Sequence, residues 1–130
     1  MAKKQIATFL GPNKGLSVVG NRVYAFSGAI GVDGTEKDLL NFTTGDDLIP
    51  CTIQFNYVQA ATEDFFYRVY FNNQLVQGYL TTHSTQYTSP DNLIPIIIPP
   101  LTSVKLTAQN VDDNNERTQL VSITGKVLDA

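Results

Sequence analysis

The sequence contains no tryptophan and only one cysteine, one histidine and one methionine. The lone cysteine, Cys51, excludes a disulfide bond within the chain, so packing alone must hold the fold together. A structural zinc site takes four Cys or His ligands, and Cys51 and His83 are the only two in the chain. We therefore expect no zinc centre.

Charge is also scarce, because charged residues make up only 16% of the sequence. The formal net charge is −3, whereas binding to nucleic-acid phosphates requires clustered Lys and Arg. The one basic cluster, Lys3 and Lys4, is expected to be a solvated tail. A nucleic-acid partner is therefore not expected.

Long apolar runs are missing as well. No stretch approaches the length of about 18 apolar residues that marks a membrane-spanning helix. The start, Met-Ala-Lys-Lys-Gln, lacks the apolar core of a secretory signal. These observations predict a soluble protein that is made without an export peptide and has no membrane partner.

The sequence does contain repeated alternation of apolar and polar residues, the pattern of half-buried β-strands. The clearest case is Pro50 to Val58, where Cys51 is expected to act as a small buried hydrophobe beside Ile53 and Phe55. A hairpin is predicted over Asp64 to Leu80, turning at Asn72 and Asn73 because Asn tolerates positive φ. Further strands are expected at Arg22–Val32, Asp38–Thr44, Leu93–Ile98, Val104–Ala108 and Gln119–Leu128, besides a short one at Gln5–Leu10.

Two of these strands carry additional expectations. Arg22–Val32 is rich in apolar and small residues on both faces, so we expect it to be covered on both sides. Pro95 cannot donate to a hydrogen-bond ladder, which predicts that Leu93–Ile98 lies at a sheet edge. The apolar faces of the strands predict a core that includes Ile53, Phe55, Val69, Phe71, Leu106 and Ile123.

The spacing of the turns predicts the fold class. Turn signals recur roughly every eight to twelve residues and no helical periodicity is sustained, which favours an all-β, antiparallel jelly roll or β-sandwich of about eight strands. This domain is expected over residues 21–130. Residues 1–20, interrupted by Gly11-Pro12, are interpreted as an extended N-terminal arm that packs on its own domain or on a neighbour.

No pattern predicts a catalytic residue or a cofactor. His83 has no recognisable nucleophile or acidic partner, and the motif Gly-x-Ser-x-Gly is absent. Glycoside hydrolysis would need carboxylates that face each other across a cleft. The candidates for that role lie in or beside turns: Glu36, Asp38, Glu63 and Asp64.

Two acidic turns, Gly45-Asp46-Asp47 and Asp112 to Glu116, offer hard oxygen ligands without the spacing of an EF-hand. We expect solvated turns, and a weak calcium site at residues 112–116 is the alternative. A sugar-binding face would display aromatic rings, but the tyrosines are expected in the core with hydroxyls at its rim: Tyr24, Tyr57, Tyr67, Tyr70 and Tyr79.

Three stretches together have a familiar layout: Gly20 to Gly28, Phe65 to Asn73 and Pro95 to Leu106. Over about residues 20 to 128 the chain resembles the small jelly-roll head decoration, or cement, proteins of tailed bacteriophages. The resemblance implies a structural virion protein on the capsid exterior, present in the host cytoplasm during assembly. It also implies a homotrimer whose partner is the major capsid protein.

The arm would then supply contacts to the capsid or to other copies through its apolar residues, Ile6, Phe9 and Leu10. Other classes remain open at this point. They are a tail-fibre or baseplate domain, a carbohydrate-binding module and a small β-barrel enzyme.

Overall fold

The computed structural model describes residues 7–9, 16–57, 63–81 and 93–128. They form eleven β-strands, and no membrane-spanning helix is found among them. The strands are β1 (Ala7–Phe9), β2 (Ser17–Val19), β3 (Arg22–Phe26), β4 (Ile30–Val32), β5 (Lys37–Thr44), β6 (Ile49–Tyr57), β7 (Phe65–Phe71), β8 (Gln74–Thr81), β9 (Leu93–Ile98), β10 (Ser103–Asn110) and β11 (Arg117–Lys126).

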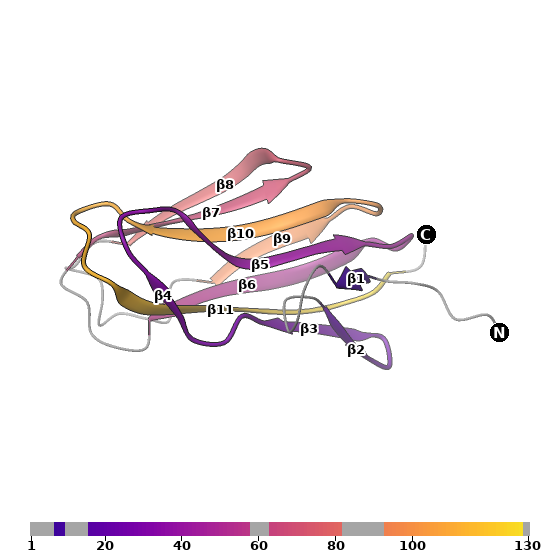
Figure 1. Ribbon diagram of the computed structural model, residues 1–130. Helices are drawn as coiled ribbons and strands as arrows, with labels where there is room; N and C mark the ends of the chain where they lie inside the picture. The colour runs from indigo at the N-terminus through magenta and orange to yellow at the C-terminus, as the bar shows by residue number, and fades with distance from the viewer. Residues whose placement is uncertain (1–6, 10–15, 58–62, 82–92, 129–130) are drawn as a thin grey trace.

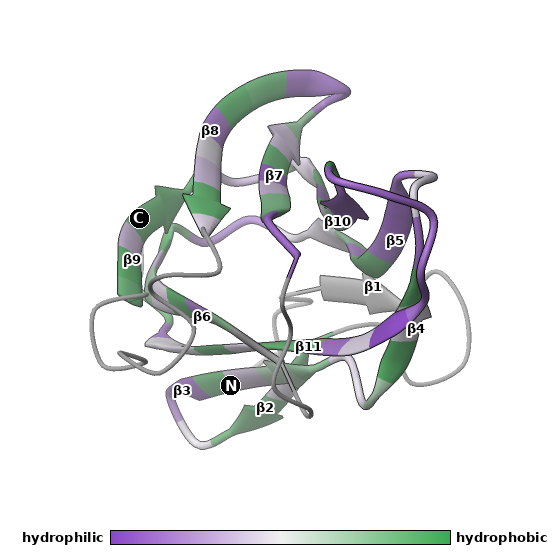
Figure 2. Cartoon of the chain, turned by 90° about the vertical axis from the view of Figure 1, so that its left-hand side faces the viewer, coloured by the Kyte–Doolittle hydropathy of each residue, from purple (hydrophilic) through white to green (hydrophobic). Residues whose placement is uncertain are grey.

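The strands are arranged in two antiparallel sheets that face each other (Figures 1 and 2). Sheet A has the order β1-β5-β10-β7-β8, and sheet B has the order β2-β3-β11-β6-β9, with β4 also paired to β11. The predicted all-β antiparallel sandwich is confirmed.

The pairing of the longer strands defines the topology. β7 pairs with β8, β6 with β9, β5 with β10 and β3 with β11, so that each hairpin encloses the one before it. This nesting places β5-β10-β7-β8 opposite β3-β11-β6-β9. Two four-stranded sheets formed by one rolled antiparallel ribbon make a jelly roll.

The core lies between the sheets and follows the predicted alternation. The predicted core residues Ile53, Phe55, Val69, Leu106 and Ile123 are each at most 1% exposed, and Cys51 is buried beside them. Phe71 is only partly buried, which corrects the prediction, because it ends β7 next to the turn and pairs with exposed Gln74. The other large buried side chains include Phe42, Phe65, Tyr67, Leu39, Leu40, Ile49, Ile98 and Gln119.

The predicted turn at Asn72 and Asn73 is confirmed. Their φ angles are +53° and +66°, the two positive values required by the tight turn that matches strand twist in a two-residue hairpin. Asn72 also fixes the hairpin to the neighbouring strand, because its Oδ1 accepts a hydrogen bond of 2.9 Å from the backbone nitrogen of Ser103. The tolerance of Asn for positive φ and the hydrogen bond to the neighbouring strand therefore both favour a turn at this position.

The segment Arg22–Val32 differs from its prediction. It forms two strands, β3 and β4, separated by Gly28 at a φ of +73°. Tyr24 and Phe26 are 45% and 57% exposed, so the expectation of cover on both faces is wrong. These side chains point to the outside of sheet B, where no other layer of described residues lies over them.

Parts of the expected N-terminal arm belong to the sheets. β1 pairs with β5 at the edge of sheet A, β2 pairs with β3 in sheet B, and Leu16 is buried in the core. The division into an arm of residues 1–20 and a body of residues 21–130 stays a prediction. At the opposite side of the sandwich, β8 and β9 are the outer strands of their sheets, as Pro95 predicted for β9.

Candidate functional site

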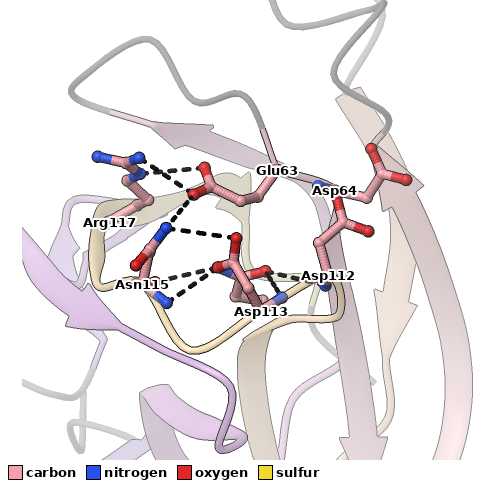
Figure 3. Close-up of polar contacts among 7 residues, drawn as sticks. Glu63, Asp64, Asp112, Asp113, Asn115 and Arg117 are labelled. Carbon is pink, nitrogen blue, oxygen red and sulfur yellow. Dashed lines mark hydrogen bonds and ion pairs between the residues drawn. The ribbon is translucent and has the colours of Figure 1, made fainter.

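The loop between β10 and β11 closes on itself at one end of the sandwich (Figure 3). Buried Asn110 organises it, because its Oδ1 accepts hydrogen bonds from the backbone nitrogens of Asp112, at 3.0 Å, and Asp113, at 3.2 Å. Its Nδ2 donates to Oδ1 of Asp113 at 2.8 Å and to the carbonyl oxygen of Asn115 at 3.0 Å. The side chain of Asn110 thus forms hydrogen bonds with several polar groups of the loop and holds the loop closed.

Glu63 joins this loop through an ion pair in which its own carboxylate is buried and the side chain of Arg117 is partly exposed. Arg117 Nε and one of its terminal nitrogens each lie 3.0 Å from a different carboxylate oxygen of Glu63, which makes the contact bidentate. Asn115 Nδ2 adds a third hydrogen bond at 3.1 Å. The hydrogen bonds from Arg117 outweigh the effect of burial and lower the pKa of Glu63 to about 2.

The loop carboxylates already serve the loop itself. Asp113 Oδ1 accepts hydrogen bonds from Asn110 and from the backbone of Asn115, and Asp112 Oδ2 accepts one of 2.8 Å from the backbone nitrogen of Asp64. Within the described ranges, no group of three or more His, Cys, Asp or Glu side chains is placed to hold a metal ion. The arrangement closes a loop and does not form a ligand cage.

The other acidic turn differs from its expectation. Asp47 is 1% exposed, so Gly45-Asp46-Asp47 is not a fully solvated turn. The turn is tied down because the carbonyl oxygen of Gly45 accepts a hydrogen bond of 2.7 Å from the backbone nitrogen of Leu101. His83, Ile6 and Leu10 lie outside the described residues, and so does the side chain of Phe9.

The outer face of sheet A carries a carboxylate beside two cations. Glu36 accepts hydrogen bonds from Thr107, at 2.5 Å, and from the hydroxyl of Tyr70, at 2.7 Å, and its other oxygen lies 3.6 Å from Arg68. Although burial alone would raise the pKa of Glu36, these contacts outweigh it and the pKa is lowered. Lys105 lies over the ring of Tyr70, with its Nζ 4.7 Å from the centroid.

The outer face of sheet B is different in kind. None of its six strands contains Asp or Glu. Arg22 and Lys126 are exposed on this side, and five large apolar side chains of the same sheet are between 45% and 65% exposed. We call this surface the B face and define it by Val19, Arg22, Tyr24, Phe26, Leu93, Ile97 and Lys126.

An open depression of about 450 Å³ lies in the B face. Its rim carries the two cations, the ring of Tyr24 and the hydroxyls of Thr52 and Thr124. Cys51 also lines it, but burial raises the pKa of this thiol to about 12, so it stays protonated and is a poor nucleophile at neutral pH. The chemistry offered here is recognition of an anion beside an aromatic ring.

The tyrosines are divided between core and surface. Tyr67 is buried, as expected, and its hydroxyl contacts Gln119 within the core. Tyr24 is half exposed, which corrects its assignment to the core. Tyr70 and Tyr79 are partly buried, and the side chain of Tyr57 is outside the described part. The sequence did contain a signal for the B face, namely strands without a single carboxylate.

These observations define the chain as a jelly-roll β-sandwich with one outer face that pairs a cation with its own carboxylate and one outer face that carries cations and exposed apolar side chains. No protein-family model matches the chain, and no curated protein matches its sequence.

Proposed function

We propose that the protein is a structural virion protein, a capsid cement or decoration protein that binds the major capsid protein from outside and stabilises the phage head. The observation that carries this proposal is a set of exposed large apolar side chains on the outside of a two-sheet β body. Jelly rolls occur in capsid proteins but also in lectins and cupins, so the fold alone does not decide the function. The choice between these functions therefore depends on the surface of the domain.

Exposed large apolar side chains occur on the B face and along the β8 and β9 edge of the sandwich. Neither β8 nor β9 contains a charged residue, and much of β9 is green, or hydrophobic, in Figure 2. Exposed apolar side chains that gather on a soluble protein mark candidate contact sites for other macromolecules. The exposed large side chains of the two strands are Leu75, Val76, Leu80, Leu93 and Ile97.

The proposed assembly is a homotrimer on the outer capsid surface. A stable interface takes above about 1,000 Å² in total, which a small domain reaches more easily when an extended arm adds to its faces. Residues 1–20 are proposed to be that arm, with Ile6, Phe9 and Leu10 as its apolar anchors. β1 is held by three residue pairs to β5, so its removal leaves the rest of both sheets in place.

The test mixes full-length protein and a variant lacking Met1 to Gly15 with heads that carry no decoration protein. Both forms should give the far-ultraviolet circular dichroism of a folded β protein, and the deletion should lower occupancy and head stability. Equal occupancy would remove the arm from the mechanism. No binding by either form would refute the decoration function, and binding to tails instead would favour a fibre or baseplate domain.

A carbohydrate-binding module is the second candidate, because Tyr24 presents a half-exposed ring beside the hydroxyls of Thr52 and Thr124. Titration calorimetry against a panel of neutral and acidic oligosaccharides tests it. Micromolar binding that is lost in Tyr24→Ala would favour this function.

A further inference from the structure

We propose that the B face is the capsid-binding surface and that it receives a carboxylate of the capsid subunit between Arg22 and Lys126. This inference rests on the proposed function and adds the location and the chemistry of the contact.

The first observation is an unneutralised pair of cations. Arg22 on β3 and Lys126 on β11 are directly opposite each other in the antiparallel register, and both are exposed on the same face. Like charges directly opposite destabilise a sheet. Among the described residues, neither side chain forms an ion pair or a hydrogen bond. An anion placed between them would remove this repulsion.

The second observation is that sheet B does not supply the anion. Its strands contain no carboxylate, whereas on the opposite face Glu36 lies among Arg68, Tyr70 and Lys105. The two outer faces therefore differ: on one, Arg68 is paired with a carboxylate of the same molecule, and on the other the cations are complementary to an external negative charge. This complementarity indicates an acidic group on the partner.

The third observation decides what kind of partner carries the group. The cations lie among exposed Val19, Tyr24 and Ile97, so the surface combines aromatic and aliphatic side chains with Arg and contains no Asp or Glu. That composition is typical of the core of a protein interface. A sugar has few apolar groups that could pack against Val19 and Ile97. A protein surface with one Asp or Glu among apolar residues complements both the cations and the apolar side chains of the B face. Such charge-assisted hydrogen bonds are strong when water is excluded.

The depression provides the required space. Arg22 and Lys126 both line it, together with Tyr24, Thr52 and Thr124, whose hydroxyls could donate further hydrogen bonds to a carboxylate. Gly125 keeps β11 close to β6, since a Cβ at this position would come within 2.5 Å of the carbonyl oxygen of Pro50. The site is therefore set by backbone packing and is available without rearrangement of the strands.

The test compares Arg22→Glu and Lys126→Glu with Lys37→Glu, the same charge change at an exposed position of sheet A. Binding to undecorated heads is measured by sedimentation. Each B-face variant is expected to bind at least about tenfold more weakly than wild type, and Lys37→Glu within about twofold of it. Arg22→Glu places a carboxylate opposite Lys126, so its unfolding temperature should not fall, which separates lost binding from lost folding.

Several results would overturn the inference. If wild type binds the heads and both B-face variants bind equally well, the surface is wrong although the decoration function stands. If wild type does not bind, both proposals fail. If the wild type is an oligomer and the B-face variants are monomers, the B face is instead an interface between copies of this chain. If polygalacturonate binds the wild type and displaces it from heads, the acidic group belongs to a saccharide.

Discussion

The hydroxyl of Tyr67 on β7 donates a hydrogen bond of 2.5 Å to Oε1 of Gln119 on β11, and so joins the two sheets through the middle of the apolar core. Both side chains are buried, and the ring of Phe55 stacks on Tyr67 with the centroids 4.4 Å apart. Within the described part of the chain, Nε2 of Gln119 has no hydrogen-bond partner. The hydrogen bond between Tyr67 and Gln119 is therefore a polar contact surrounded by the apolar side chains of the core.

Tyr67→Phe should lower the free energy of unfolding by about 1–3 kcal/mol, because it leaves Oε1 of Gln119 buried without a donor. The double variant Tyr67→Phe with Gln119→Leu should recover much of this loss, since it removes both polar groups together. Denaturant titration of the two single variants and the double variant measures the coupling. Strictly additive losses would show that the two side chains do not depend on each other.

Phe55→Ala should lower the free energy of unfolding by about 3–5 kcal/mol, because it removes a fully buried ring and leaves a cavity beside Tyr67. Phe26→Ala is the matched control, since Phe26 is more than half exposed on the B face. This control should change the free energy by less than about 0.5 kcal/mol. Similar losses in reversible denaturation would mean that the inner and outer faces have been exchanged.

Alternation predicted the strands whose two faces meet different environments. β6 and β7 each place one face in the core and one outside, so period 2 is strong in both. The alternation was less informative for Arg22 to Val32, because two large aromatic residues, Tyr24 and Phe26, occupy solvent-facing positions there. β2, only three residues long, was not distinguished from the expected arm.

The contribution of the ion pair between Glu63 and Arg117 to the stability of the fold should depend on pH. The pKa of Glu63 is about 2 in the folded protein, below the ordinary value of 4.5 for a glutamate, so the ion pair stabilises the fold above about pH 4.5 and its contribution is lost as the pH falls towards 2. Glu63→Gln should therefore be less stable than wild type near neutral pH, and the difference should shrink over that acid range. Thermal unfolding of both proteins from pH 7 to pH 2 measures it. A difference that stays constant would refute the assignment.

The sequence could not predict this ion pair. Glu63 and Arg117 are 54 residues apart in the chain, and only the jelly-roll connections bring the loop before β7 next to the start of β11. The B face depends on the same long-range order, because Arg22 and Lys126 become neighbours only when β3 pairs with β11. Local patterns identify strands, whereas surfaces of this kind depend on which strands pair.

Calcium should not bind in the micromolar range. The oxygens of Asp112 and Asp113 accept hydrogen bonds from backbone nitrogens of the same region, which holds these carboxylates within the closed loop. Among the described residues, no third acidic side chain joins them in a group that could hold a metal ion. Titration calorimetry with calcium chloride is the measurement. A clear micromolar isotherm that disappears in Asp113→Asn would contradict the expectation.

The position of β11 affects how the protein is made. It lies in the middle of sheet B, between β3 and β6, yet it is the last of the described strands in chain order. On the ribosome, β3 and β6 therefore have no shared partner until residues 117–126 have emerged. Pairing between such distant segments is slow, and the nascent chain keeps apolar surface open in the meantime. A premature stop before Arg117 would remove the centre of a sheet, so we expect truncated products to be degraded or to aggregate.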